Sequence, residues 1–445
     1  MDAAKTLPLV EKWSEEFSTI ARQGGPGWLQ ELRSNAAGQF GSAGLPTRRN
    51  EEWKYTPVRL LEGLRPTTAP DDGRTVAETH FPQPPLCEDA AVVSIVNGVL
   101  SFPLPGMTAG VTLLPLGEAI EKFGKKLQPL FSGVELEGAG RMFSALNTAF
   151  LDQGLVVHVD KNTQAGNLLV RWALSGEETV RLGNFRLVIL LEQGAKLDFI
   201  EQFESASAAR GALNVLTQID LSNEAELSHV RMQDEGDDVV LLTSTSIQQA
   251  AASVYQYSGF DLGGGLVRHE LHTELAGAGA FAGFDGAFVL DGKRHVDNHI
   301  SVDHAAPGCS SNQFFRGVLG GSSRGVFNGR ALIRPGSDES VVYQSNANLL
   351  LSRLAEIDTK PELEIYADEV EASHGATVGQ LDESAIFYMR TRGLSDPEAR
   401  RMLTAAFCHA VSDRLRDAGL SEIISRRLDA AMPGDQPIAA EISDA

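Results

Sequence analysis

The chain has 445 residues, of which 42% are hydrophobic and 22% are charged, and its formal net charge is −21 at pH 7. This length allows two or three domains with a sizeable apolar core. The acidic balance argues against a nucleic-acid-binding surface, which requires clustered Lys and Arg, and no apolar run is long enough to predict a membrane span.

The first 90 residues predict a helical domain that ends in an exposed connection. In residues 5–23 apolar side chains recur every three to four positions, which is typical of a helix with one buried face. A GGPG break follows, and a second helix begins near Trp28. Residues 63–90 are rich in Pro, Thr, Asp and Gly and indicate an irregular loop. The start of the chain has no basic segment and no apolar signal core, so we expect a cytoplasmic protein.

Residues 91–380 predict a mainly β domain. The segment LVRHELHTEL, residues 266–275, alternates apolar and polar residues as a half-buried strand does. Residues 213–232 indicate two strands joined by a turn at 223–225. Because no helix-length pattern separates such strands, the sequence argues against a βαβ sheet, and a sandwich, a barrel and a β-solenoid remain equally open.

Residues 381–432 predict a second helical domain, followed by a frayed tail at 433–445. Ser395 and Glu398 form a capping box in the sequence SDPE. Apolar residues then recur at helical spacing in two helices and must cover either the chain's own core or a partner. The residues of this stripe are Leu403, Phe407, Val411, Leu415 and Ile424.

The densest histidine cluster is the segment RHVDNHISVDH. On a strand His295, Asp297 and His299 share one face, and His304 follows beyond them. Imidazole and carboxylate together can hold Zn or Fe, so a metal-dependent, cupin-like β-barrel enzyme is one hypothesis. The simpler interpretation is a polar strand face, because ligands must also converge from several elements.

Other catalytic motifs are missing from the sequence. It contains no GxxxxGK[ST] loop and no GxSxG, so any ATP that the function needs is bound by another chain. The three cysteines are far apart and predict no disulfide framework. Cys309 has no context that indicates a reactive thiol, Cys408 fits a buried helix position, and Cys87 lies in the Pro-rich connection.

His374 has a more specific context, in EIYADEVEASHGATVGQLDE. PELEIYADEV predicts a strand, ASHGATVGQLDE a glycine-punctuated turn, and SAIFYMRTRGL a helix. A neutral imidazole at such a strand end can ligate a metal or accept a proton near neutral pH, although a lone histidine is more often structural.

At these residues the chain resembles the SufB/SufD family of iron–sulfur cluster assembly scaffold proteins, on its SufD side. The resemblance is nearly continuous through HVDNHISVDHAAPGCSSNQFFRGVLGGSSRGVFNGRALI and through YQSNANLLLSRLAEIDTKPELEIYADEVEASHGATVGQLDESAIFYMRTRGLS, and it includes TRRNEEWKYTPVRLL at residues 47–61. It implies a right-handed parallel β-helix core flanked by N-terminal and C-terminal helical domains.

The resemblance also implies a function. Such chains are non-enzymatic subunits that pair with SufB through the β-core, while their C-terminal helices dock the SufC ATPase and no nucleotide binds to the chain itself. A transient Fe–S cluster, shared with SufB, is held at the seam and passed to apoprotein or carrier acceptors. The labile ligand of this subunit is then His374, and without SufB the chain could form a homodimer.

One departure from the family pattern constrains this assignment. Many relatives carry cysteine two positions before the histidine, whereas this chain has Ala372. His374 must therefore act together with ligands of the partner or not act as a ligand at all. Glu371 and Asp382 are candidates for orienting its second ring nitrogen.

Overall fold

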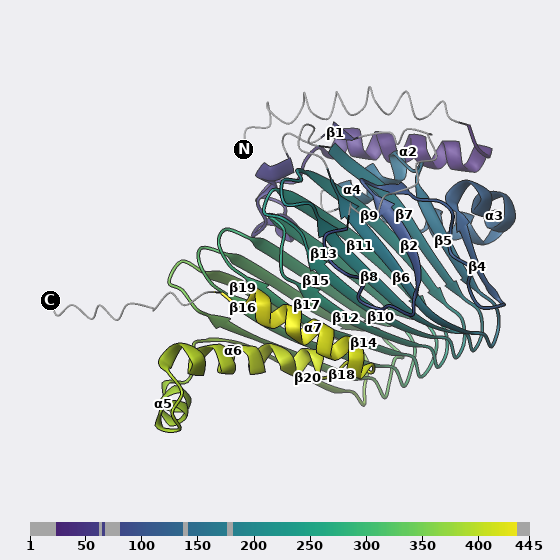
Figure 1. Cartoon of the computed structure of the whole chain (residues 1–445). Coiled ribbons are helices and arrows are strands. Elements are labelled where there is room, and N and C mark those ends of the chain that lie inside the picture. The colour runs from purple at the N-terminus through teal and green to yellow at the C-terminus, as the bar shows by residue number, and fades with distance from the viewer. Residues whose placement is uncertain (1–23, 62–64, 67–80, 137–140, 176–180, 434–445) are drawn as a thin grey trace.

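A computed structural model describes residues 24–61, 65–66, 81–136, 141–175 and 181–433 of the chain. The helix expected at 5–23, most of the connection at 63–90 and nearly all of the tail lie outside these residues. The described part consists of a long β-core with helices packed on its two outer faces (Figure 1).

The strands of this described part form two ten-stranded sheets. Consecutive core strands alternate between them, and strands within each sheet run parallel from β5 and β6 onward, so the chain winds as a parallel β-helix. Sheet A contains β4 (Val111–Pro115), β5 (Gly154–Val159), β7 (Arg181–Leu191), β9 (Gly211–Leu221), β11 (Val239–Gln249), β13 (Leu266–Leu275), β15 (His295–His304), β17 (Arg324–Ile333) and β19 (Glu356–Ile365), with β1 (Arg65–Pro66) beside β7. Sheet B contains β3 (Val99–Leu100), β2 (Ala91–Val96), β6 (Gln164–Leu174), β8 (Lys196–Ser205), β10 (Glu226–Asp234), β12 (Val254–Asp261), β14 (Phe281–Leu290), β16 (Ser310–Leu319), β18 (Val341–Leu350) and β20 (Glu371–Gly379).

A repeated short turn joins the sheets along one edge. One residue of each turn takes a left-handed conformation, with φ between 51° and 71°, and this residue recurs every 27 to 32 residues. The backbone N–H of Glu224, for example, donates to the carbonyl of Ala251 in the next turn, at 2.9 Å. This ladder offsets the roughly 1–2 kcal/mol that a left-handed residue other than glycine costs. The turn residues are Asn162, Gly194, Glu224, Ala252, Gly279, Gly308, Glu339 and Glu369.

Strand alternation separates the interior of the β-helix from its outer faces. In β13 the predicted pattern is present, since Val267, His269, Leu271, Thr273 and Leu275 are all buried inside the core. Most interior positions are apolar and form one continuous cluster along the axis, which includes the stacked rings of Trp172 and Phe203. Hydrophobic burial of this size is the main stabilising contribution to the core.

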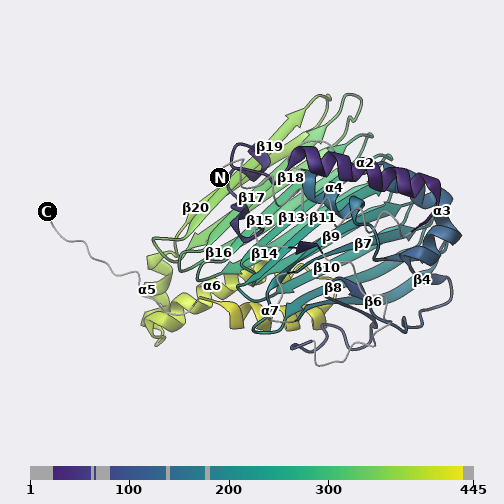
Figure 2. The same cartoon turned by 90° about the horizontal axis from the view of Figure 1, so that it is seen from above.

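Helices from the N-terminal part cover the outer face of sheet A. The α2 helix (Gly27–Ala43) begins where the sequence predicted it and packs on α4 (Met142–Ala149), and α3 (Leu116–Ser132) packs on β4 and β5. Two short 3₁₀ helices, η1 (Glu51–Trp53) and η2 (Val58–Leu61), continue this cover. Seen from above, α2 crosses the strands of sheet A (Figure 2).

Three helices of the described part follow the β-core, and two of them cover the outer face of sheet B. The three helices are α5 (Glu383–Thr391), α6 (Asp396–Ser412) and α7 (Ala418–Ala431). The capping box predicted at Ser395 and Glu398 is formed at the start of α6. Helices α6 and α7 pack on β14 and β16, whereas α5 projects away from the core (Figure 1).

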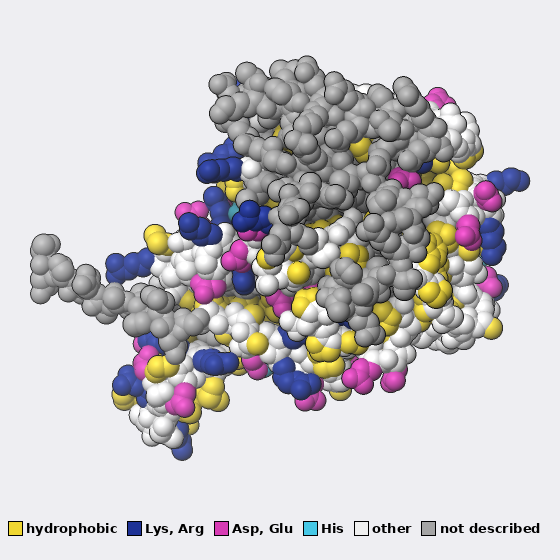
Figure 3. Space-filling model, turned by 45° about the horizontal axis from the view of Figure 1, so that its top comes forward, with side chains coloured by type: hydrophobic (Ala, Val, Ile, Leu, Met, Phe, Trp, Pro, Cys, Tyr) yellow, Lys and Arg dark blue, Asp and Glu magenta, His cyan; other side chains and the backbone are white. Residues whose placement is uncertain are grey.

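The predicted fold class, a mainly β protein with a β-helix core and helices at both ends, is confirmed. This observation settles the choice among sandwich, barrel and solenoid. None of the described helices is both long and apolar enough to cross a membrane. On the face shown in Figure 3, acidic and basic side chains are interspersed over the described part.

Candidate functional site

His374 lies on the last strand of sheet B, where the β-helix ends. Strand β20 pairs with β18 along one edge only, and the parallel register places His374 beside Gln344. Side chains at paired positions lie on the same face of a sheet, and Gln344 points inward because it is only 5% exposed. His374 therefore lies on the inner face but is exposed, since in the described part of the chain no further rung follows β20.

The prediction of a turn at residues 372–383 was wrong for most of its length. Residues Glu371–Gly379 form a strand, because β18 offers a continuous parallel edge with which their backbone pairs. The two glycines of this segment, Gly375 and Gly379, have ordinary φ angles and open space where a Cβ would lie, so the backbone does not require them for a turn. The helix expected after this segment is present as α5.

Both carboxylates suggested as partners of His374 already accept a hydrogen bond through one oxygen, and neither is bonded to the imidazole. The Asp382 side chain caps α5 by accepting from the backbone N–H of Ser384 at 2.8 Å. The Glu371 carboxylate accepts a hydrogen bond from the Tyr343 hydroxyl. Within the described residues, the imidazole of His374 has no hydrogen-bond or ion-pair partner.

Large apolar side chains are exposed on the same terminal rung as His374. Val378 on β20 is 48% exposed, and Ile365 at the end of β19 is 42% exposed. Tyr366 and Leu354, in the neighbouring turns, are 62% and 70% exposed. An uncovered apolar end and an unpaired strand edge together are typical of a surface that another β-protein covers.

The three histidines of the cupin-like hypothesis do not form a metal site. His295, Asp297 and His299 do share the outer face of β15, but residues of the N-terminal part cover that face. Thr56 donates to the Asp297 carboxylate and also lies 3.2 Å from His295 Nε2. His304 faces the interior and bonds Ser311 Oγ at 2.8 Å. Among the described residues no group of three or more His, Cys, Asp and Glu side chains could hold a metal ion, so this hypothesis was wrong.

The motif at residues 47–61 instead forms a clamp between the N-terminal part and the β-core. The Arg268 guanidinium lies 4.1 Å from the ring of buried Trp53 and also pairs with the Asp297 carboxylate. Burial opposes ionisation of Asp297, but Arg268 outweighs it and holds the pKa of this carboxyl well below its usual range. Burial lowers the pKa of neighbouring His295 to about 4. These groups therefore have a structural role.

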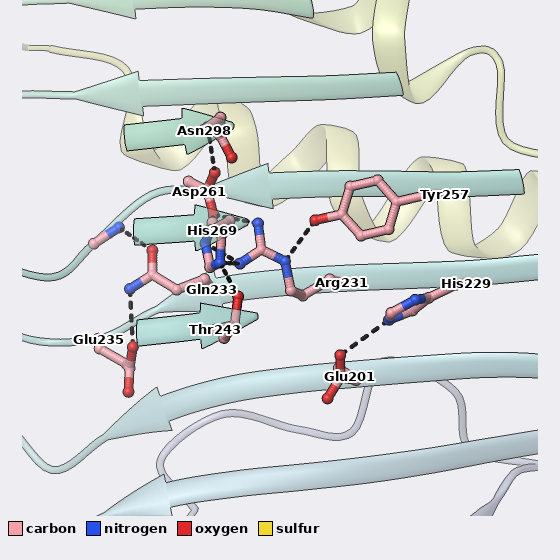
Figure 4. A network of polar contacts seen from close by, with 11 residues as sticks. Glu201, His229, Arg231, Gln233, Glu235, Thr243, Tyr257, Asp261, His269 and Asn298 are labelled. Atoms are coloured by element: carbon pink, nitrogen blue, oxygen red, sulfur yellow. Dashed lines mark hydrogen bonds and ion pairs between the residues drawn. The ribbon is translucent and has the colours of Figure 1, made fainter. Parts of the chain in front are cut away.

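A polar network inside the β-helix was missed by the sequence analysis (Figure 4). Glu201 accepts from Trp172 Nε1 at 3.1 Å and lies 2.9 Å from His229 Nε2. Arg231 donates to Asp261 at 2.9 Å, and Asp261 also lies 3.1 Å from His269 Nε2. These residues come from successive rungs about thirty positions apart in the sequence, a distance at which no local pattern connects them.

Burial and charge pairing set the protonation of this network. Burial lowers the pKa of His269 to about 4, and the nearby Arg231 guanidinium acts in the same direction. Burial raises the pKa of the Asp261 carboxyl, but the Arg231 guanidinium outweighs this effect and lowers the pKa to about 2. The adjoining cavity has a volume of about 10 Å³, room for no more than one water molecule. The network is therefore closed to a substrate.

The apolar stripe predicted to dock an ATPase lies mostly against the chain's own core. Val411 and Ile424 are fully buried on sheet B, and Phe407 and Leu415 pack partly against the same cluster. Leu403 is half-buried. The buried side chains of this stripe attach α6 and α7 to the β-core, and its role as a contact surface for an ATPase stays a prediction.

The exposed apolar side chains of the C-terminal helices lie elsewhere. Phe387 and Tyr388 on α5 are 68% and 58% exposed, and Met402 on α6 is 53% exposed. No sequence pattern marks these three residues, because their neighbours on the helix surface are a mixture of charged, polar and alanine residues.

The cysteines contribute no reactive group at the open end. Cys408 is buried on α6, where burial raises the pKa of its thiol to about 12. Cys309 is buried between rungs, and burial raises the pKa of its thiol as well. Cys87 lies on the loop that crosses sheet B, close to Asn167.

The sequence matches the family model described as "SUF system FeS cluster assembly, SufBD core domain" over residues 174–407. The chain belongs to the SufBD family. The matched region contains the strands from β7 to β20 and most of α6, and so includes His374. The resemblance that the sequence showed is thereby confirmed, and the family is one of iron–sulfur cluster assembly.

Similar SufBD proteins come from bacteria and plants. One relative, "Iron-sulfur cluster assembly protein SufD" of Escherichia coli (strain K12), is 28% identical over 96% of this chain and 97% of its own length. A SufBD family protein of Synechocystis is 28% identical over 88% of each chain. "Protein ABCI7, chloroplastic" of Arabidopsis thaliana is 26% identical over 92% of this chain and 86% of its own.

Proposed function

We propose that this chain is the SufD-type subunit of an assembly scaffold. In this proposal a SufB-type chain pairs with the open end of the β-helix, a SufC-type ATPase docks on the C-terminal helices, and the nascent Fe–S cluster is the cargo. The chain itself is not an enzyme and binds no nucleotide. Finished clusters pass to apoprotein or carrier acceptors in the cytoplasm.

The open end supports pairing with a second β-helix chain. The outer edge of β20 leaves backbone N–H and C=O groups available, and the exposed apolar side chains beside it include Ile365 and Val378. Main-chain hydrogen bonds along such an edge supply affinity, and the neighbouring side chains supply specificity. The same edge could join two copies of this chain when the SufB-type subunit is absent.

His374 is the residue that we assign to the cargo. The imidazole of His374 is exposed and has no partner among the described residues, so it can coordinate iron through one ring nitrogen without first breaking an internal contact. Imidazole is neutral and binds iron less strongly than thiolate does, which suits a scaffold that must release its product. The three cysteines of this chain lie on other elements, so the thiolate ligands in this proposal come from the partner.

The proposed ATPase-docking surface is the exposed apolar part of α5 and α6. Phe387, Tyr388 and Met402 are large apolar side chains that the chain's own core leaves uncovered. Helix α5 projects away from the β-core, where a second protein can reach it (Figure 1). A SufC-type partner also accounts for the lack of a phosphate-binding loop in this sequence.

The exposure of His374 on the terminal rung is the observation on which this proposal depends. The experiment is tandem-affinity purification after anaerobic co-expression with SufB-type and SufC-type chains. We expect one stable complex that carries iron and acid-labile sulfide. A chain that purifies alone, or a complex that forms without any iron and sulfide, would overturn the proposal.

A further inference from the structure

Two buried glutamines lie beneath His374 in one column. Gln313 on β16, Gln344 on β18 and His374 on β20 occupy the same register position on successive rungs. Gln313 and Gln344 are 1% and 5% exposed, so the column lies on the inner face.

Each glutamine is anchored through its amide nitrogen. Nε2 of Gln344 donates to the carbonyl of Gly329 at 3.3 Å, and Nε2 of Gln313 donates to that of Arg330 at 3.5 Å. These contacts fix which end of each amide is oxygen. In both residues Oε1 is buried and has no hydrogen-bond partner in the described structure. A buried acceptor without a partner costs about 1–3 kcal/mol, so one that persists calls for an explanation.

Gln344 and Gln313 differ in the residue that occupies the same position on the next strand toward the open end. The neighbour of Gln313 toward the open end is Gln344, whereas the neighbour of Gln344 is the exposed imidazole of His374. Adjacent strands are about 4.8 Å apart, a separation that these two side chains can span. An exposed side chain changes rotamer within picoseconds to nanoseconds, so the ring can turn down onto the amide oxygen.

We propose that Oε1 of Gln344 accepts a hydrogen bond from one ring nitrogen of His374, fixes its tautomer and directs the other nitrogen toward the seam. This inference rests on the proposed ligand role of His374. Gln344 is then a positioning residue and touches no cargo. One oxygen of Glu371 and one of Asp382 are engaged elsewhere, whereas the buried Gln344 oxygen, on the strand paired with His374, has no partner in the described structure.

The test is the tautomer of His374 in the full-length chain. Imidazole nitrogens labelled with ¹⁵N report which nitrogen carries the proton, at an alkaline pH where the ring is neutral. We expect His374 of the wild type to hold its proton mainly on one nitrogen. In Gln344→Met this bias should be lost, and the signals should shift to those of an exposed histidine such as His272.

Two further variants control for structural effects. Gln313→Met removes an equally buried, equally unpartnered amide one rung deeper and should leave the tautomer of His374 unchanged. Gln344→Glu keeps an acceptor at the same place and should retain the bias. Equal ¹⁵N shifts of His374 in the wild type and in Gln344→Met overturn the proposal, as does an equal loss of bias in both methionine variants.

A binding measurement separates this inference from the proposed function. Ferrous ion, added to the assembled complex against a competing chelator, should bind about 10-fold more weakly to Gln344→Met, as is typical when a residue that orients a metal ligand is removed. Undiminished affinity in Gln344→Met together with lost affinity in His374→Ala overturns only the role of Gln344. Full affinity in His374→Ala overturns the ligand role itself, whatever the tautomer.

Discussion

Gln344 and His374 occupy the same position on neighbouring parallel strands, and yet one is buried and the other exposed. The difference arises because β20 is the last strand of sheet B in the described part of the chain. The inner face of the earlier strands is covered by the next rung, whereas the inner face of β20 meets solvent. A ligand at this place is held by a rigid ladder and remains accessible to a second chain. Rigid elements position functional groups more accurately than loops do.

Exposed Phe387 should contribute to ATPase binding. Phe387→Asp places a charge on an apolar side chain that is 68% exposed, so we expect loss of co-purification with the SufC-type ATPase. Stability should change by no more than about 0.5 kcal/mol, as is usual for surface substitutions. Gln128→Asp on α3 is the control, since this residue is also exposed but lies on sheet A's side. Stoichiometric recovery of the ATPase with Phe387→Asp would show that α5 is not the contact.

Buried Ile424 should instead contribute to stability. Ile424→Ala opens a cavity between α7 and sheet B, and we expect it to lower the free energy of unfolding by about 2–5 kcal/mol and to increase proteolysis of the C-terminal helices. Ile423→Ala, at a partly buried neighbouring position, should lower the free energy of unfolding clearly less. Equal losses in the two variants, measured by denaturant unfolding, would contradict the assignment of this stripe to the core.

The interior network should make the fold sensitive to mild acid. Burial lowers the pKa of His269 to about 4, whereas an unfolded histidine titrates near 6.5. Between these values the unfolded chain binds more protons, so the free energy of unfolding falls as the pH drops from about 6.5 toward 4. His269→Gln removes this contribution and should flatten the pH dependence by up to about 1.4 kcal/mol per pH unit. The measurement is the free energy of unfolding at several pH values. An equal pH dependence in the variant and the wild type would contradict this role of His269.

The open edge should allow self-association when no SufB-type chain is present. We expect the isolated chain to form a dimer at high concentration, as detected by sedimentation equilibrium. Val378→Lys introduces a charge at the exposed end of β20 and should leave a monomer. Ala410→Lys, on the exposed side of α6, should still dimerise. A wild-type chain that is monomeric at every concentration would argue that this edge is blocked.

Much of the architecture could be predicted from the sequence, and the reasons for the exceptions are physical. The alternation of apolar and polar residues in β13 and the capping box at Ser395 each depend on residues close together in the sequence, so a short segment is enough to predict them. The rung repeat was not visible, because the left-handed turn is occupied by glycine at Gly194 but by Glu224 and Ala252 in the next two turns. The hydrogen-bond ladder between turns, and not residue type, maintains that conformation.

The candidate site was predicted less completely for a related reason. His374 stood out through a family resemblance, but its strand conformation depends on pairing with β18, thirty residues earlier. Burial of Val411 and of Asp297 likewise depends on which distant surface each meets. A stripe on a helix has the same pattern whether it covers the chain's own sheet or a partner's.

His374 is proposed to hold iron at a seam between two chains. The most direct measurement is the iron and sulfide content of the complex that contains His374→Ala, purified anaerobically beside the wild type and beside His272→Ala, a control at another exposed histidine. We expect His374→Ala to assemble with both partners but to lose its iron and sulfide, while His272→Ala retains both. An intact complex of His374→Ala with wild-type iron and sulfide would show that His374 is not the iron ligand.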